Sequence, residues 1–218
     1  MSRVVFDFTG ENFVVTGASS GMGRQVAVEL ATAGANVLAI ARNEARLQEL
    51  QSQYPANISV AALDVCDSEK MENAIKDFVG EHGKLHGGVH AAGINNFTPL
   101  KTYDKSLANK IMDTSFWAGV ELARIVTKAK YANKGMSTVL FSSVCAQSDE
   151  KGMFAYASAK AAVNNLCLRT DMLLSNIQSH RTILLFRFRG NNHIQLLDGV
   201  YCFDGQKLWI PRAYTNTI

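Results

Sequence analysis

The sequence has few cysteines and few prolines, and it lacks any long apolar run. No apolar stretch approaches the length of a membrane-spanning helix, and residues 1–12 lack the basic start and apolar core of a signal peptide. We therefore expect neither membrane insertion nor export. The four cysteines show neither a CxxC pair nor the Cys/His spacing of a zinc site: Cys66, Cys145, Cys167 and Cys202. They are expected to be reduced, buried thiols of a cytoplasmic protein, and no metal site is expected.

Charge is also modest and evenly spread. Charged residues make up 19% of the chain, the formal net charge is +3, and basic residues form no runs. This pattern gives no indication of nucleic-acid binding. With 218 residues and 47% apolar content, the chain has material for one sizeable core, so we expect a single domain over residues 1–218.

Short apolar runs alternate with helical patterns along the chain. The expected strands cover residues 13–16, 36–41, 58–63, 87–92 and 138–142. Helices are expected up to Gly34, from a cap at Asn43 to about Gln53, from Asp67 or Ser68 to about His82, and over residues 106–131. Because the strands are continuously apolar, the sequence predicts a doubly wound parallel sheet covered on both faces, a three-layer, Rossmann-like α/β fold.

A glycine-rich turn follows the first expected strand. Gly17, Gly21 and Gly23 have the spacing Gly-x-x-x-Gly-x-Gly, a variant of the dinucleotide fingerprint. Such glycines permit a tight turn and close approach of the backbone to a pyrophosphate, and the next helix supplies amide donors. The alternative is a glycine-rich connection without a ligand. In the first strand-turn-helix of an α/β chain, cofactor binding is the favoured interpretation.

Two strand ends bear on the choice of cofactor. Arg42, followed by Asn43, stands where NAD enzymes commonly place an acidic residue, and an arginine there can pair with the 2′-phosphate of NADP. A surface arginine packed on the adenine ring would give the same pattern. Asp64 is placed to accept a hydrogen bond from the adenine amino group, or to cap a helix.

Tyr156 and Lys160 are four positions apart, so on a helix they share one face. A free tyrosine ionises near pH ~10, but a neighbouring cation stabilises the phenolate and lowers the pKa of the phenol. The spacing therefore suits a tyrosine that acts as an acid or base near neutral pH. A Tyr and Lys pair at this spacing also occurs on ordinary helix surfaces.

Five segments together give the chain a family resemblance: residues 16–23, 64–65, 90–93, 142–143 and 156–160. They resemble the short-chain dehydrogenase/reductase superfamily, in particular its 3-oxoacyl-carrier-protein reductase-like branch, and the overlap runs from about Phe6 to Asn165. The resemblance implies a nicotinamide cofactor, and Arg42 favours NADP. The cofactor-binding residues that it implies are Gly17, Ser19, Ser20, Gly21, Met22, Gly23, Arg42, Asn43, Asp64, Val65, Ala91, Ala92, Gly93, Tyr156 and Lys160.

The resemblance also assigns catalytic roles. Tyr156 would protonate a carbonyl oxygen, Lys160 would lower the pKa of Tyr156 and hold the nicotinamide ribose, and Ser143 would orient the substrate oxygen. Ser142 is the less favoured serine, and either hydroxyl could instead satisfy backbone groups at the strand end. Ser115 aligns with the asparagine that binds a relay water in the family. His90 replaces a family asparagine, and we interpret it as a buried, hydrogen-bonded histidine.

The C-terminal part, residues 166–218, diverges from the family and is expected to be shortened. It has no Pro-Gly turn, although residues 181–189 are consistent with a sixth strand and residues 204–210 with a last one. A frameshifted or spliced ending is one hypothesis, because codons for residues 187–192 read one base later can spell Gly-Phe-Val-Glu-Thr-Thr. The gene sequence tests it, since incompatible third bases would exclude that phrase.

The resulting prediction is an NADP(H)-dependent oxidoreductase that interconverts a carbonyl and a secondary alcohol on a small or acyl-type substrate. The alternative is a catalytically impaired family member that binds nucleotide and acts as an interaction or regulatory module. Ser115 and the absent C-terminal loop motivate that alternative. By resemblance, we expect a homo-oligomer, a dimer or tetramer, formed through the long fourth and fifth helices.

Overall fold

The computed structural model describes residues 6–147, 151–173, 181–189, 193–204 and 207–209, with side chains described as far as Leu166. Its contacts form two compact units. The first comprises Met1–Ala92 and Ala118–Met136, and the second comprises Gly93–Trp117 and Ser137–Ile218.

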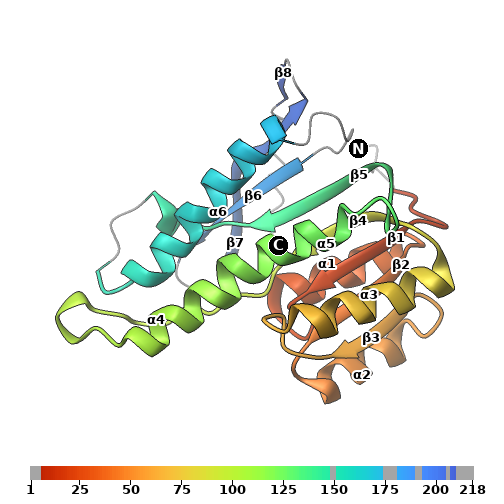
Figure 1. Ribbon diagram of the computed structural model, residues 1–218, viewed down its shortest axis with the longest axis horizontal. Helices are drawn as coiled ribbons and strands as arrows, with labels where there is room; N and C mark the ends of the chain where they lie inside the picture. Colours follow the sequence, from red (N-terminus) through yellow and green to blue (C-terminus); the bar gives the residue numbers. More distant parts are fainter. Residues whose placement is uncertain (1–5, 148–150, 174–180, 190–192, 205–206, 210–218) are drawn as a thin grey trace. The chain divides into compact units, whose positions relative to one another are not determined.

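The first unit is built on parallel strands that alternate with helices (Figure 1). Its elements are β1 (Asn12–Thr16), α1 (Gly21–Thr32), β2 (Asn36–Ala41), α2 (Glu44–Gln53), β3 (Ile58–Ala62), α3 (Ser68–His82), β4 (Leu85–His90) and α5 (Ala118–Val126). The strands are ordered β3-β2-β1-β4, with Val14 opposite both Leu38 and Gly88. This order is that of the doubly wound, Rossmann-like fold that the sequence predicts.

Helices cover both faces of these strands. The central strands β1, β2 and β4 are buried almost throughout, as expected for a parallel sheet enclosed on two sides. One core cluster joins strand residues such as Val14 and Ile40 to Ile75 of α3 and Leu122 of α5, and it contains no residue of α1 or α2. We infer that α3 and α5 cover one face and that α1 and α2 cover the other.

Local capping explains where two of these helices begin. The Asn43 side chain accepts a hydrogen bond from the Arg46 N–H, and the Asp67 side chain accepts one from the Lys70 N–H. Each oxygen satisfies an amide that has no partner within its helix. The helix starts predicted from Asn43 and Asp67 are therefore confirmed.

The second unit carries the helix that contains Tyr156 and Lys160. Its elements are a short 3₁₀ turn η1 (Leu100–Thr102), α4 (Lys105–Met112), a π-helical segment η2 (Asp113–Trp117), a 3₁₀ turn η3 (Val144–Ala146), α6 (Phe154–Leu173), β6 (Arg181–Arg189), β7 (His193–Asp204) and β8 (Lys207–Trp209). Strand β5 (Ala132–Phe141) begins in the first unit and ends in the second.

The strands that follow α6 test the prediction of a sixth strand and of a last one. Strand β6 pairs in parallel with β5, with Thr138 opposite Arg181, so the predicted sixth strand is confirmed. It continues into an antiparallel hairpin with β7, and β7 pairs with β8. A short strand therefore lies within residues 204–210, as expected.

Three elements differ from the prediction by two residues or more. The helix expected over residues 106–131 is interrupted by η2 and ends at Val126. The fifth strand starts at Ala132, next to Tyr131, whose carbonyl accepts the N–H of Leu85 at the start of β4. The fourth strand covers Leu85–His90, two residues earlier than expected at both ends.

One burial prediction was wrong. Cys145 is buried as expected, but Cys66 is exposed, because it lies in the turn between β3 and α3. The side chains of Cys167 and Cys202 lie outside the described residues. Among the described residues, no helix has the length and apolar character required to span a membrane.

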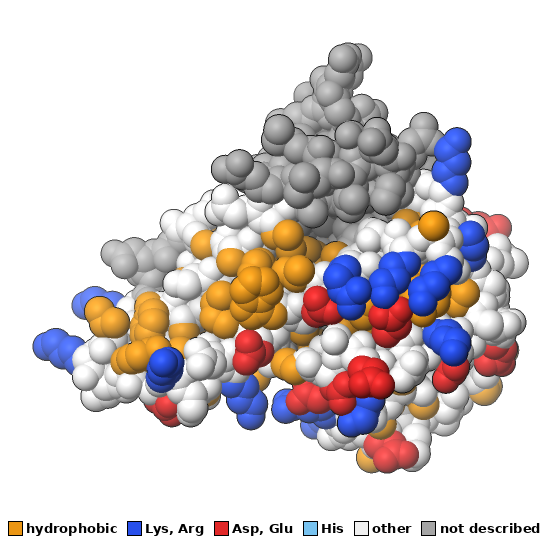
Figure 2. Space-filling view, viewed as in Figure 1, with side chains coloured by type: hydrophobic (Ala, Val, Ile, Leu, Met, Phe, Trp, Pro, Cys, Tyr) orange, Lys and Arg blue, Asp and Glu red, His pale blue; other side chains and the backbone are white. Residues whose placement is uncertain are grey.

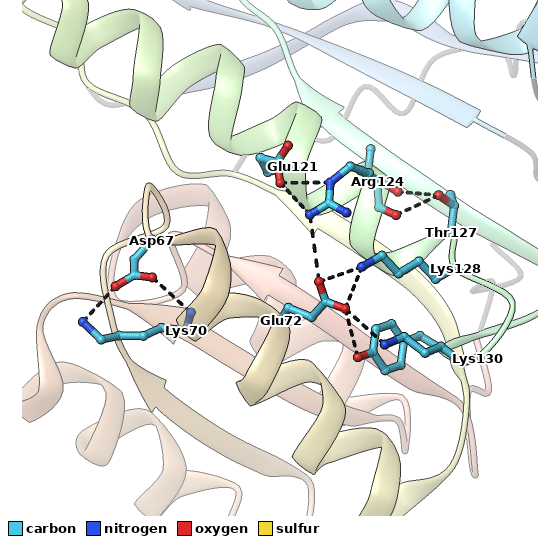
Figure 3. A network of polar contacts seen from close by, with 10 residues as sticks. Asp67, Lys70, Glu72, Glu121, Arg124, Thr127, Lys128 and Lys130 are labelled. Atoms are coloured by element: carbon cyan, nitrogen blue, oxygen red, sulfur yellow. Dashed lines mark hydrogen bonds and ion pairs between the residues drawn. The ribbon is translucent and has the colours of Figure 1, made fainter.

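An ion cluster around Glu72 ties α3 to the turn after α5 (Figure 3). The Lys128 ammonium lies 2.6 Å from the Glu72 carboxylate, and the Lys130 ammonium and Tyr131 hydroxyl lie 3.2 Å from it. The Arg124 guanidinium, 3.9 Å away, also pairs with Glu121 at 2.8 Å. Hydrogen bonds, that from Lys128 foremost, lower the pKa of Glu72 from 4.5 to about 2.

We predict that Glu72→Gln lowers the melting temperature at neutral pH by about 2–4 °C. The folded-state pKa of Glu72 lies below its unfolded value, so the stabilisation is complete above about pH 4.5 and is lost as the pH falls toward about 2. The melting difference from wild type should shrink over that range in calorimetric scans. Glu49→Gln, which removes a more exposed pair with Arg24 at 3.4 Å, is the matched control. A Glu72→Gln difference that is independent of pH would contradict the account.

Candidate active site

The glycine turn between β1 and α1 depends on close backbone contacts within the first unit. Gly17 has φ of 72°, and a Cβ atom there would lie 2.7 Å from the Ala92 nitrogen. A Cβ on Gly23 would lie 2.5 Å from the Gly17 carbonyl oxygen. Any side chain at Gly17 or Gly23 would therefore force the turn open.

Gly21 has a different role in the turn. Its φ of 55° favours glycine, yet a Cβ atom there would meet nothing within 4 Å. The open space lies at the first residue of α1, next to amides that have no helical partner. A ligand group can therefore approach the backbone at this position.

The start of α1 lacks the side-chain cap that α2, α3 and α4 have. Ser20, the residue before α1, makes no capping hydrogen bond, and the first turn contains no acidic residue. In α4, by contrast, the Asp104 side chain accepts the N–H groups of Ser106 and Leu107. The amides at the start of α1 and the helix dipole thus suit an anionic group, and Ser19, Ser20 and Met22, which were predicted to bind the cofactor, lie in or beside this turn.

The predicted adenosine-side residues lie beyond β2 and β3. Arg42 is exposed, and its guanidinium has no ion pair with any described residue. The Asn43 side-chain oxygen is occupied in capping α2. The exposed Asp64 carboxylate accepts the Cys66 N–H at 3.0 Å, while Asp67 caps α3, so the helix-cap alternative for Asp64 was wrong. Val65 is buried in the core of the first unit.

Small residues follow β4. Backbone atoms of Ala91 and Ala92 are those that a Cβ on Gly17 would meet first, and the Ala91 N–H donates to the Thr16 carbonyl at 3.2 Å. His90 is buried, and its Nδ1 lies 2.9 Å from the Thr16 hydroxyl. A Cβ at Gly119 would lie 2.9 Å from the imidazole ring. The interpretation of His90 as a buried, hydrogen-bonded histidine is confirmed.

Tyr156 and Lys160 lie on the first two turns of α6, in the second unit. Lys160 is 4% exposed, and its ammonium donates to the Phe141 carbonyl at 2.7 Å. The same nitrogen lies 5.7 Å from the centre of the Tyr156 ring. Burial lowers the pKa of Lys160 from 10.5 to about 8, so the side chain is still mostly cationic at neutral pH.

The two serines after β5 make different hydrogen bonds. The Ser142 hydroxyl donates to the Lys160 carbonyl at 3.2 Å, so the hydroxyl hydrogen of Ser142 is already bonded to the backbone of α6. The Ser143 oxygen accepts the Cys145 N–H at 3.2 Å, and its hydrogen has no acceptor among the described residues. Ser143, not Ser142, therefore has a donor available for a substrate oxygen.

Ser115 is fully buried in the π-helical segment η2. Its oxygen accepts the Ile94 N–H at 3.1 Å. A Cβ atom on Gly93 would lie 3.4 Å from the Ser115 oxygen and 3.7 Å from the Lys160 ammonium. Because Gly93 has no side chain, only its backbone lies between Ser115 and Lys160. These residues and Ser143 and Tyr156 all belong to the second unit.

One residue of this unit, Thr98, could not be identified from local sequence patterns. Thr98 is 2% exposed, and its hydroxyl accepts the Ala155 N–H in the first turn of α6. Its only sequence feature is its place before Pro99, which favours extended backbone. Its partners lie 54 and 57 residues further along the chain, beyond the reach of local patterns.

Comparison with known proteins adds independent evidence. The family model described as short chain dehydrogenase matches residues 11–178. The match extends further toward the C-terminus than the predicted overlap, which ends at Asn165.

Individual relatives agree with the family match. A short chain dehydrogenase of Pseudocercospora fijiensis is 32% identical over 160 residues, which cover 71% of this chain and 52% of that protein. A 3-oxoacyl-[acyl-carrier-protein] reductase of Escherichia coli is 29% identical over 157 residues, which cover 72% of this chain and 64% of that protein. The chain spans about half the length of the first curated relatives that it matches.

The fold has counterparts among solved structures. A short-chain dehydrogenase from Streptomyces avermitilis superposes with a TM-score of 0.76 at 26% identity, covering 84% of this chain and 67% of that one. The predicted family and the doubly wound fold are thus confirmed. By its family-model match and its relatives, the chain belongs to the short chain dehydrogenase family.

Proposed function

We propose that this protein is an NADP(H)-dependent oxidoreductase that interconverts a carbonyl and a secondary alcohol, with Tyr156 as the general acid and base. The observation that carries the proposal is the buried Lys160 ammonium beside the Tyr156 ring. Family membership supports an oxidoreductase that uses a nicotinamide cofactor, either NAD or NADP. The choice of NADP and the roles of individual residues are our own inferences.

Tyr156 would deliver the proton to the substrate oxygen. A cation near the phenol stabilises the phenolate, so Lys160 lowers the pKa of Tyr156 and makes the proton easier to transfer. Because the pKa of Lys160 is about 8, this support is present at neutral pH and is lost at higher pH as the ammonium is deprotonated. In alcohol oxidation, the same phenolate takes the proton back.

Ser143 would bind the substrate oxygen. Its hydroxyl is held from one side by the Cys145 N–H, which leaves the O–H to donate to the oxygen as negative charge develops. A donor held in place before the reaction stabilises that charge with little reorganisation. Ser142 contributes indirectly, because it fixes the backbone of Lys160.

Ser115 would stand where the family has its relay asparagine. Its oxygen already accepts the Ile94 N–H, so only the hydroxyl hydrogen remains to bind a relay water. It also holds the backbone beside Gly93, close to Lys160. We propose that Ser115 both supports the backbone beside Gly93 and binds the relay water.

The nicotinamide cofactor supplies the hydride that reduces the carbonyl carbon. The amides at the start of α1 and the open space at Gly21 fit its pyrophosphate. The exposed Arg42 guanidinium, without an ion pair among the described residues, fits the 2′-phosphate of NADP. Asp64 and Val65 would contact the adenine, and Ala91, Ala92 and Gly93 would leave room for the cofactor.

We expect a homo-oligomer that uses the fourth and fifth helices expected from the sequence, which correspond to the segment from α4 to α5 and to α6. In the second unit, Leu100, Tyr103 and Trp117 are large apolar side chains that are exposed. Figure 2 shows hydrophobic side chains gathered on the face that it presents. Patches of this kind often mark protein interfaces.

Light scattering of the purified chain should give the mass of a dimer or tetramer, and a monomer across a wide concentration range would contradict this expectation.

The decisive variant for the reaction is Tyr156→Phe, which removes the hydroxyl and keeps the ring. We predict that kcat for NADPH-dependent reduction, measured over a panel of small and acyl-type carbonyls, falls by about 10²–10⁴-fold. NADPH affinity, followed by cofactor fluorescence, should change little. Equal turnover by wild type and variant would exclude Tyr156 as the acid. NADPH binding without turnover by wild type across the panel would favour a nucleotide-binding module without catalysis.

Arg42→Ala tests the choice of cofactor. Losing one charge-assisted hydrogen bond should weaken NADPH binding by about 10- to 100-fold and leave NADH binding nearly unchanged. Titration of each cofactor by fluorescence measures both constants. Arg46→Ala, which removes a nearby exposed arginine in α2, is the matched control. An equal loss of affinity for NADPH and NADH would indicate packing on the adenine ring instead of contact with the 2′-phosphate.

A further inference from the structure

We propose that Thr98 is a positioning residue that fixes the first turn of α6 and thereby the place of the Tyr156 phenol. Its effect on catalysis rests on the function proposed above. Its effect on α6 rests on contacts within the second unit alone.

The Thr98 hydroxyl is buried and uses both of its hydrogen-bonding functions. It donates to the Gly152 carbonyl at 3.5 Å and accepts the Ala155 N–H at 3.4 Å. Ala155 is the second residue of α6, where the backbone N–H has no partner within the helix. Thr98 thus does for α6 what a capping side chain usually does from the residue before the helix.

The backbone around Thr98 is joined to the same segment. The Thr98 N–H donates to the Gly152 carbonyl, and Thr98 and Met153 form an isolated parallel β-bridge. Gly152 has φ of 75°, and a Cβ atom there would collide with the Phe97 ring. Residues 97 and 98 therefore lie directly against the segment that leads into α6.

A second anchor holds α6 one turn further along. The Lys160 ammonium donates to the Phe141 carbonyl, and the Ser142 hydroxyl donates to the Lys160 carbonyl. Tyr156 lies between this anchor and Thr98, directly after Ala155. If the Thr98 anchor is lost, the first turn can fray while Lys160 stays in place. The Tyr156 phenol then moves relative to the ammonium that lowers its pKa.

The test uses Thr98→Val, which keeps the shape of the side chain and removes both hydrogen bonds. We expect kcat to fall about 10-fold, with little change in KM for NADPH. In alcohol oxidation, the midpoint of the pH–rate profile should move to higher pH, because the phenol loses the support of Lys160. Thr98→Ser keeps the hydroxyl and should restore both values. Thr127→Val removes a hydrogen bond to the Ala123 carbonyl in α5 and is the matched control.

Amide hydrogen exchange of the full chain provides a readout that does not require turnover. In Thr98→Val, exchange at Ala155 and Tyr156 should quicken by about 3- to 10-fold, while exchange around Lys160 stays as in wild type. Unchanged exchange at Ala155 would overturn the anchor. Quicker exchange with an unmoved kcat and pH profile would overturn the positioning role. If wild type reduces no carbonyl, the proposed function fails, and the exchange measurement still decides whether Thr98 fixes the turn.

Discussion

The burial of one ammonium group organises the part of the second unit that carries Tyr156. Lys160 is almost inaccessible to water, and an unpaired buried charge would be costly, so its ammonium needs an acceptor. The carbonyl of Phe141, the last residue of β5, is that acceptor, and Ser142 holds the Lys160 backbone in turn. The remaining desolvation lowers the pKa of Lys160 to about 8, and the charge that persists at neutral pH lies beside the Tyr156 ring. The end of β5 and the start of α6 are thus joined beside Tyr156, the residue that we propose as the proton donor.

The turn between β1 and α1 depends on a different constraint, which is the absence of side chains at its glycines. Gly17 and Gly23 have no room for a Cβ atom, whereas Gly21 faces open space. The first two make the turn tight, and the third leaves the uncapped start of α1 accessible to an anion. The contacts described for Lys160 lie within the second unit, and those of the glycine turn lie within the first.

Much of this was predictable because the signals are local. Asn43 and Asp67 satisfy amides three residues away, and the four-residue spacing of Tyr156 and Lys160 fixes their common helical face. The break in the long helix was not predictable, since the π-helical segment involves a buried Ser115 whose oxygen meets the distant Ile94 N–H. The contacts of Thr98 were not predictable for the same reason, because its partners also lie far along the chain. Roles for Tyr156, Lys160, Ser143, Ser115 and Arg42 stay predictions, because they concern a substrate and a cofactor.

The central claim is that Lys160 makes the Tyr156 phenol a stronger acid. The direct measurement is a ¹³C NMR titration of the chain labelled at the tyrosine phenol carbon, with Tyr156→Phe used to assign the resonance. The account predicts a midpoint well below the ordinary value of about 10 in wild type, and a return to about 10 or higher in Lys160→Met. The same midpoint in wild type and Lys160→Met would contradict it.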